Sequence, residues 1–132
     1  MTPQEFWQES FDHHPFGYLT TTGRNSGEPH RIEIWFAQEN NRVYLLSGGR
    51  DRSDWVRNLL ANPVVTFELG GETVAGVAQV LAEGSSHDQR ARELLVKKYQ
   101  KKDELIEWGR NSLGVVIMLG RGDTADDAAA DQ

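Results

Sequence analysis

The chain has 132 residues, a formal net charge of −6 and no cysteine. This length suits one domain with a single core, and the lack of cysteine excludes disulfides, thiolate metal sites and cysteine nucleophiles. The negative charge argues against nucleic acid as the main partner, because binding by counterion release needs a broad basic surface.

The start of the chain predicts a helix rather than a targeting segment. The first eleven residues contain acidic side chains and lack a basic start followed by an apolar run, so they do not resemble a signal peptide. Thr2-Pro3-Gln4-Glu5 is typical of a capping box with proline at the first helical position, and the short helix it predicts is ended by Pro15. No stretch reaches the apolar length of a transmembrane helix. We therefore expect a soluble, cytoplasmic protein.

Six runs rich in β-branched and aromatic residues, bounded by turn-forming residues, predict β-strands. In the second run, strict alternation places Ile32, Ile34 and Phe36 on one face, as in a half-buried strand. We expect the first three strands to form a meander. In chain order the predicted strands span residues 16–22, 30–37, 42–47, 64–69, 72–83 and 113–119.

Capping residues and apolar side chains at helical spacing predict three further helices. The first begins after Asp51 or Ser53 and stops at Asn62-Pro63. The second begins after Ser85 or Ser86. These helices span residues 54–61, 86–100 and 103–109.

The order of these elements favours one α+β, mainly β domain over residues 1–120. Six short strands, with a helix between the third and fourth and another before the last, are typical of a six-stranded antiparallel barrel with peripheral helices. A Rossmann fold does not fit, because no strand leads into a glycine-rich helix start with the required spacing. Residues 121–132 alternate aspartate with alanine, and we expect them to form a disordered acidic tail.

The loop after the first predicted strand has the composition of an anion site. Thr20-Thr-Thr-Gly-Arg-Asn-Ser-Gly27 combines hydroxyls, two glycines, an amide and an arginine. Such a loop can wrap backbone N–H groups around an oxyanion, while Arg24 and Ser26 add side-chain donors. An ordinary hairpin turn with solvated polar residues is the alternative.

A second candidate is Ser47-Gly-Gly-Arg50, where a strand leads towards a helix start. Glycines allow a ligand to approach the backbone, and helix N-termini attract anions. Asp51 and Asp54 favour the alternative of a capped helix, because they already occupy the positive end of that helix. Six arginines and no lysine lie between residues 24 and 57, and arginine is the better residue for bidentate phosphate contacts.

The remaining polar patterns predict no metal chemistry. His13 and His14 are adjacent, so they diverge on a helix, and no second pair has metal-ligand spacing. Arg31 and Glu33 are neighbours on one strand face, where we expect an ion pair.

Four blocks of the sequence resemble the deazaflavin (F420)-dependent nitroreductase and quinone reductase family, within the flavin-binding split-barrel group that includes pyridoxamine phosphate oxidases. They appear in the family's order and spacing and, with their flanking strands, cover about residues 16 to 82. The blocks are Leu19-Thr-Thr-Thr-Gly-Arg-Asn-Ser-Gly-Glu-Pro29, Trp35-Phe36, Val43-Tyr-Leu-Leu-Ser-Gly-Gly49 and Asp54-Trp-Val-Arg-Asn-Leu-Leu-Ala-Asn-Pro63.

The resemblance implies a split barrel that binds coenzyme F420 and transfers hydride to a nitro, quinone or related organic acceptor, and a homodimer as in the wider group. It implies that the first hairpin loop holds the cofactor phosphate, with the second glycine loop and the following helix nearby. The implied cofactor-binding residues are Thr22, Gly23, Arg24, Asn25, Ser26, Gly27, Ser47, Gly48, Gly49, Arg50, Trp55 and Asn58.

Three interpretations remain open from the sequence. The arginine-rich segment favours an F420-dependent reductase, because a polyanionic tail needs a cationic groove. Asn25 stands where the family often has lysine, which favours FMN as the cofactor or a non-catalytic protein that binds a cofactor, haem or lipid. No catalytic acid is evident, and Tyr18, Tyr44 and Ser47 are the nearest candidates for a proton donor.

Overall fold

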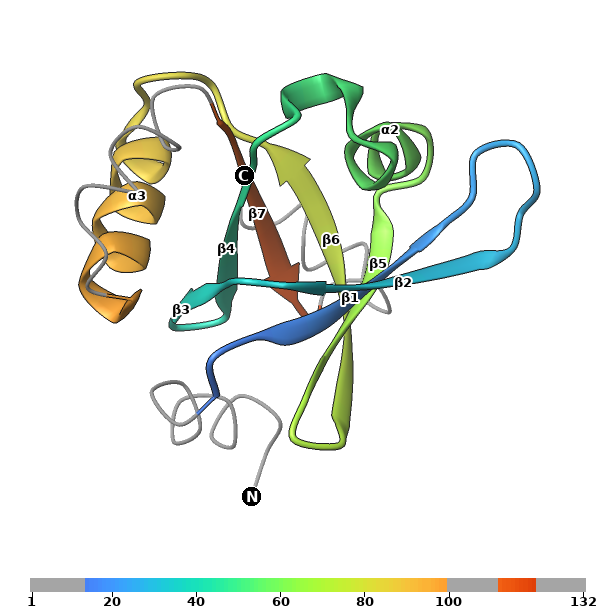
Figure 1. Cartoon of the computed structure of the whole chain (residues 1–132), viewed down its shortest axis with the longest axis horizontal. Helices are drawn as coiled ribbons and strands as arrows, with labels where there is room; N and C mark the ends of the chain where they lie inside the picture. Colours follow the sequence, from blue (N-terminus) through green and yellow to red (C-terminus); the bar gives the residue numbers. More distant parts are fainter. Residues whose placement is uncertain (1–13, 100–111, 121–132) are drawn as a thin grey trace.

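The computed structural model describes residues 14–99 and 112–120. Within them the chain forms seven strands, a 3-10 helix η2 and two α-helices (Figure 1). The strands are β1 (Gly17–Thr22), β2 (Pro29–Ile34), β3 (Ala37–Glu39), β4 (Arg42–Ser47), β5 (Val64–Leu69), β6 (Glu72–Val80) and β7 (Leu113–Leu119), and the helices are η2 (Arg50–Arg52), α2 (Asp54–Ala61) and α3 (Ser86–Tyr99).

The seven described strands pair antiparallel in one sheet, in the order β2-β1-β5-β6-β7-β4-β3. The two edge strands, β2 and β3, follow each other directly in the chain, so the sheet curls until its edges are bridged by residues 35 and 36 (Figure 1). This confirms the predicted split-barrel class. The expected meander is wrong, because β2 pairs with β1 whereas β3 and β4 lie at the opposite edge.

The predicted second strand, residues 30–37, is divided into β2 and β3, which makes seven strands instead of six. The backbone at Phe36 bonds to side chains of α3 in place of a neighbouring strand. Its N–H donates to the Tyr99 hydroxyl at 3.0 Å, and its carbonyl accepts from Lys98 Nζ at 3.1 Å. The Trp35 ring stacks on the Tyr99 ring with centroids 4.4 Å apart. Alternation of side chains cannot reveal this break, because the hydrogen-bond partners of Phe36 are more than sixty positions away in the sequence.

The helices begin near the expected capping residues. The Ser85 hydroxyl accepts the Asp88 N–H at 3.2 Å and caps α3. Ser53 precedes α2, but its hydroxyl bonds the Ser47 hydroxyl at 2.8 Å and makes no capping bond. The fifth predicted strand, 72–83, ends at Val80. The predicted helices over the first residues and 103–109, like the acidic tail, lie outside the described residues.

Two apolar clusters hold the elements together. The first fills the barrel and includes Leu19, Phe36, Phe67 and Ile117, all fully buried. The second lies between the sheet and α3, which packs against β3, β4 and β7. Burying such side chains gives about 1.5–3 kcal/mol each, which explains why the barrel is the stable frame for the exposed loops.

Helix α2 is placed by its apolar side. Val56 and Leu59 are buried in or beside the barrel core, and Trp55 packs partly against it. Asn58 lies on the same side and is only 4% exposed. The helix contacts β1 and β6, so its first two turns face the hairpin of β1 and β2 (Figure 1).

Candidate functional site

A cleft of about 470 Å³ lies between the β1–β2 hairpin and α2. Its walls combine backbone and polar side chains of the hairpin with the first turns of the helix. The lining residues are Thr21, Gly23, Arg24, Asn25, Ser26, His30, Arg31, Ile32, Asp54, Trp55 and Asn58.

The hairpin loop is folded tightly by its own bonds. Gly23 N–H donates to the Glu28 carbonyl and Gly27 N–H to the Gly23 carbonyl, both at 2.8 Å. The Ser26 hydroxyl accepts the Glu28 N–H at 3.1 Å. A Cβ on Gly23 would lie 2.6 Å from both His30 Nε2 and Ser26 Oγ, so a side chain at this position would force both groups to shift.

Asn58 ties this loop to the helix. Its Oδ1 accepts the Arg24 backbone N–H at 3.1 Å and Arg24 Nη1 at 2.8 Å. Its Nδ2 donates to the Thr21 hydroxyl at 3.1 Å. Because Asn58 and Thr21 are almost completely buried, these bonds set the distance between the two walls.

Arg24 carries the positive charge nearest the centre of the loop. Its side chain is 28% exposed, and Nη2 lies 3.2 Å from the Asp54 carboxylate, which is 85% exposed. A guanidinium has five N–H donors. The bonds to Asn58 and Asp54 use only some of them, so Arg24 keeps donors for an anion, although Asp54 offsets part of its charge.

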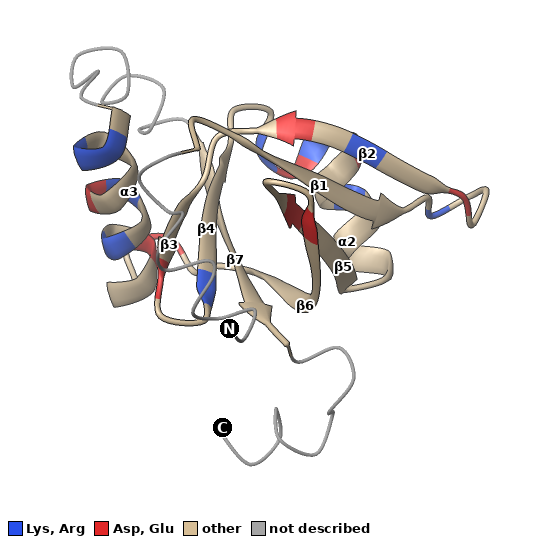
Figure 2. Cartoon of the chain, turned by 90° about the horizontal axis from the view of Figure 1, so that it is seen from below, with Lys and Arg blue, Asp and Glu red and all other residues tan. Residues whose placement is uncertain are grey.

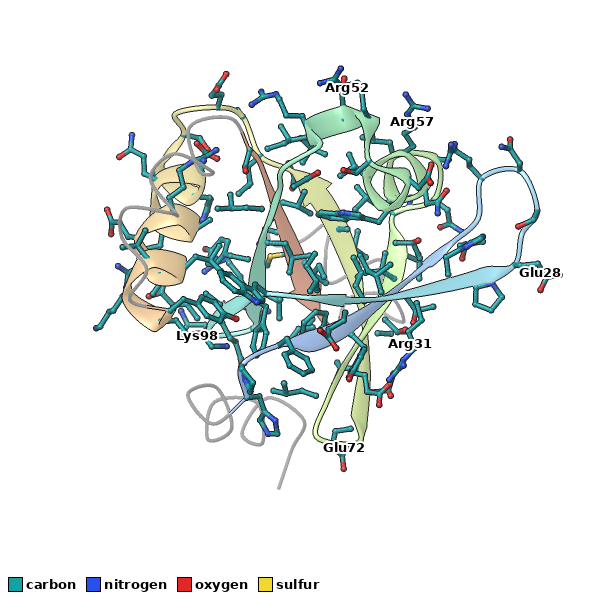
Figure 3. The ribbon with its side chains drawn as sticks, viewed as in Figure 1. Glu28, Arg31, Arg52, Arg57, Glu72 and Lys98 are labelled. Atoms are coloured by element: carbon teal, nitrogen blue, oxygen red, sulfur yellow. The ribbon has the colours of Figure 1, made fainter. Side chains whose placement is uncertain are left out.

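Strand β2 presents different residues on its two faces. Arg31 points away from α2, as Figure 3 shows, and pairs with Glu68 at 3.1 Å while its guanidinium lies 3.8 Å from the Tyr18 ring centroid. The expected ion pair between Arg31 and Glu33 is therefore wrong: the carboxylate of β5 is the partner. Side chains alternate along a strand, so His30 lies on the other face of β2, towards the cleft.

The structure brings six of the twelve sequence-predicted cofactor residues into the cleft wall. Thr22 and Gly27 belong to the same hairpin but do not line the cleft. The four residues of the second glycine loop lie elsewhere, between β4 and α2. The six lining residues are Gly23, Arg24, Asn25, Ser26, Trp55 and Asn58.

The second glycine loop turns away from this cleft. The Ser47 hydroxyl is 2% exposed and bonds the Arg50 carbonyl at 2.9 Å as well as Ser53. Arg50 reaches the Ser112 carbonyl at 3.4 Å and lies 3.9 Å from the Glu83 carboxylate. Gly48 and Gly49 are exposed. A contact between residues 47–50 and a cofactor stays a prediction.

The side chains considered as proton donors do not line the cleft. Tyr44 is fully buried, its hydroxyl lies 3.2 Å from His87 Nδ1, and burial raises the pKa of its phenol. The Tyr18 ring lies under Arg31, and Ser47 is bonded within its own loop. None of these three residues is therefore placed to donate a proton to a ligand in the cleft.

Sequence reasoning missed five lining residues: Thr21, His30, Arg31, Ile32 and Asp54. For His30 a signal was present. It lies two residues before the inward-facing Ile32, on the same face of the strand, and at the strand end nearest the hairpin loop. Thr21 belonged to the predicted loop as one of its hydroxyls, but no local signal indicated its bond to the distant Asn58.

Charge is distributed unevenly around the molecule. Figure 2 shows basic residues on the β1–β2 side and on α3, where acidic residues alternate with them. Among residues 14–99 and 112–120, no group of three or more His, Asp or Glu side chains gathers as a metal site. No helix in this part of the chain is both long and apolar enough to span a membrane.

A family model described as F420H(2)-dependent quinone reductase matches residues 7–119. The chain belongs to this family. The match confirms the resemblance deduced from the four sequence blocks and covers β1 to β7, with the whole cleft inside it.

Solved structures show the same fold. A conserved hypothetical protein from Mycobacterium tuberculosis is similar with a TM-score of 0.73 and 23% identity, covering 92% of this chain and 82% of that chain. An F420-H2 dependent reductase, FDR-A, has a TM-score of 0.65 and 23% identity over 79% and 94%. A putative pyridoxamine 5'-phosphate oxidase from Listeria innocua has a TM-score of 0.66 and 17% identity over 90% and 94%. At these identities the likenesses establish the split-barrel fold.

The cleft suits the phosphate of a family cofactor. His30 Nε2 and Ser26 Oγ occupy the space that a Cβ on Gly23 would need, so the glycine allows these two polar groups to lie close together in the cleft wall. Arg24 stands next to it with spare donors, and the Trp55 ring forms part of the opposite wall. An anion and a flat ring system match these donors and this wall.

Proposed function

We propose that this member of the F420H2-dependent quinone reductase family is a reductase that binds coenzyme F420 and passes hydride to a nitro, quinone or related organic acceptor. The observation that supports it most directly is the hairpin loop, where Gly23 lets the Ser26 hydroxyl and the His30 ring lie close to an arginine that Asn58 holds in place. The family match supports the choice of cofactor.

The roles of the chain's own residues follow from their positions. Arg24 and Ser26 hold the phosphate through side-chain donors, and Asn58 keeps Arg24 aimed at it. Trp55 offers an aromatic surface to the ring system. When bound, the deazaflavin supplies the hydride itself, and the protein fixes orientation and environment.

FMN is the second candidate cofactor. Asn25 is neutral, and Asp54 offsets part of the Arg24 charge, which lowers the positive charge available to a long polyanionic tail. FMN carries a phosphate without such a tail. The two candidates therefore differ in the charge they demand of the same loop.

The deciding experiment is a parallel titration of the purified protein with F420 and FMN, followed by tryptophan quenching. We expect F420 to bind at least tenfold more tightly than FMN, and reduced F420 to be oxidised when a quinone or nitroaromatic compound is added. Stronger binding of FMN would favour the second candidate. Binding of neither cofactor would contradict both and leave a non-catalytic protein of this fold.

Arg24→Ala and Arg52→Ala form a matched pair for the phosphate contact. Both changes remove one arginine, but Arg52 lies on η2 and points outwards, away from the hairpin (Figure 3). A charge-assisted contact contributes about 1.5–3 kcal/mol, so Arg24→Ala should weaken binding more than about tenfold. Arg52→Ala should change it less than about twofold. Equal effects of the two variants would refute the clamp at Arg24.

We also propose that the protein is a homodimer. The outer edge of β2 has no neighbouring strand among the described residues, and the hairpin that carries it is exposed (Figure 1). Light scattering coupled to size exclusion, which should give twice the mass of one chain, provides the test.

A further inference from the structure

The His30 imidazole occupies the cleft without a bonding partner. It lies on β2 directly opposite Thr21 of β1, and it lines the cleft beside the hairpin loop. Within the described part of the chain, neither ring nitrogen of His30 has a hydrogen-bond or ion-pair partner. The neighbouring basic groups, in contrast, have partners of their own.

The two arginines nearest His30 are both paired with carboxylates of other elements. In the hairpin loop, Arg24 is paired with Asp54 of α2 at 3.2 Å. On β2 itself, Arg31 is paired with Glu68 of β5 at 3.1 Å. Each arginine thus has a carboxylate partner. An anion that enters the cleft must share Arg24 with Asp54, whereas Arg31 is held on the other face of β2 by Glu68.

Gly23 brings the imidazole to the anion-binding loop. His30 Nε2 and Ser26 Oγ both lie 2.6 Å from the point where a Cβ of Gly23 would stand. An imidazole nitrogen and a hydroxyl therefore lie beside the same glycine. This is the geometry of two donors that can contact different oxygens of one phosphate.

We propose that His30 is a further ligand-binding residue of this cleft, which contacts the phosphate of the ligand in its protonated form. The inference rests on the proposed function for the identity of the ligand, but not for the anion contact itself. Histidine changes charge between pH 5 and 8. Because the phosphate favours the charged imidazole, binding takes up a proton and affinity falls as the pH rises.

His30→Gln and His87→Gln provide a matched pair for the first test. Both changes remove one imidazole, but His87 lies on α3 and contacts Tyr44, outside the cleft. We expect His30→Gln to weaken F420 binding about tenfold at pH 6 and less than about twofold at pH 8, because only a charged contact is that strong. The F420 affinity of His87→Gln should equal that of the unaltered protein at both pH values. Protonation of the ligand itself affects the affinity of all three proteins equally, so it cancels when the affinity of each variant is divided by that of the unaltered protein.

The second test uses inorganic phosphate and the unaltered protein, so it depends neither on F420 nor on a variant that folds. In proton–carbon NMR spectra, the His30 ring signal, assigned by its loss in His30→Gln, should shift with phosphate at pH 6 and much less at pH 8. The signal of His87 should not move.

The outcomes separate this inference from the proposed function. If F420 binds but its affinity ratio between the unaltered protein and His30→Gln stays near one at pH 6, the inference is refuted and the function stands. If neither cofactor binds while phosphate shifts the His30 signal, the function fails and the anion contact stands. A His30 signal that phosphate leaves unmoved at pH 6 refutes the inference in either case.

Discussion

Replacing Asn58 with alanine tests whether one buried amide holds the cleft together. The change removes three hydrogen bonds, two from Arg24 at 3.1 and 2.8 Å and one to the Thr21 hydroxyl at 3.1 Å. Each neutral bond contributes about 0.5–1.5 kcal/mol, and one to a charged group more. Since the Arg24 side chain is partly exposed, we expect a total loss of about 2–4 kcal/mol in the free energy of unfolding.

Urea denaturation of four proteins isolates the contribution of the helix-to-strand bond. These are the unaltered protein, Asn58→Ala, Thr21→Val and the double variant. Thr21→Val keeps the side-chain volume but removes the hydroxyl that accepts the hydrogen bond from Asn58 Nδ2. The double-mutant cycle should give a coupling energy of about 0.5–1.5 kcal/mol, because the two residues share one bond.

Binding supplies the second readout for the same variant. Once Asn58 no longer holds Arg24, the loop must be ordered by the ligand, and F420 affinity should fall about tenfold. A loss of less than about 1 kcal/mol in stability together with unchanged affinity would refute the reasoning, because a residue that is 4% exposed would then contribute nothing through its bonds.

Three further changes have expected outcomes. Asp54→Asn should tighten cofactor binding, measured by tryptophan quenching, because it removes the negative charge that competes for Arg24; weaker binding would contradict this. The hydrogen bond from Arg90 holds the pKa of Glu39 below its ordinary value, so this pair stabilises the fold at neutral pH and the effect disappears in acid. Glu39→Gln should therefore lower Tm slightly at pH 7 and not below about pH 3, and a constant difference would contradict the linkage. Burial raises the pKa of Tyr99 from 10.0 to about 12. The stabilising effect of the neutral phenol should therefore be complete below pH 10 and decrease as the pH rises towards 12. Tyr99→Phe should remove this alkaline loss of stability, measured by thermal unfolding from pH 8 to 11.

Local chemistry determined most of the elements and the main anion-binding candidate. The turn residues after β1 predicted the hairpin loop, and Asn62-Pro63 predicted the end of α2, because these effects act over only a few residues. The same holds for the cap at Ser85. The sequence also predicted that Arg24 and Ser26 would stand together, since neighbours in a tight loop cannot separate.

Tertiary structure alone decided which distant residues meet. The division of the second predicted strand depends on Tyr99 and Lys98, which reach Phe36 from α3. The partner of Arg31 proved to be Glu68, because the sheet order places β5 next to β1. Composition and spacing carry no information on such pairings, since they depend on how the sheet curls and which strands become its edges.

The cleft depends on both the local sequence and the tertiary structure. From the sequence, both glycine-containing loops were candidates for parts of one site, although Asp51 and Asp54 already favoured a capped helix at the second. Packing separated them: Asn58 draws the first loop onto α2, whereas Arg50 directs the second towards Ser112 and Glu83. The local sequence thus determined which residues are able to bind an anion. Long-range hydrogen bonds and barrel closure determined which of these residues face the same cleft.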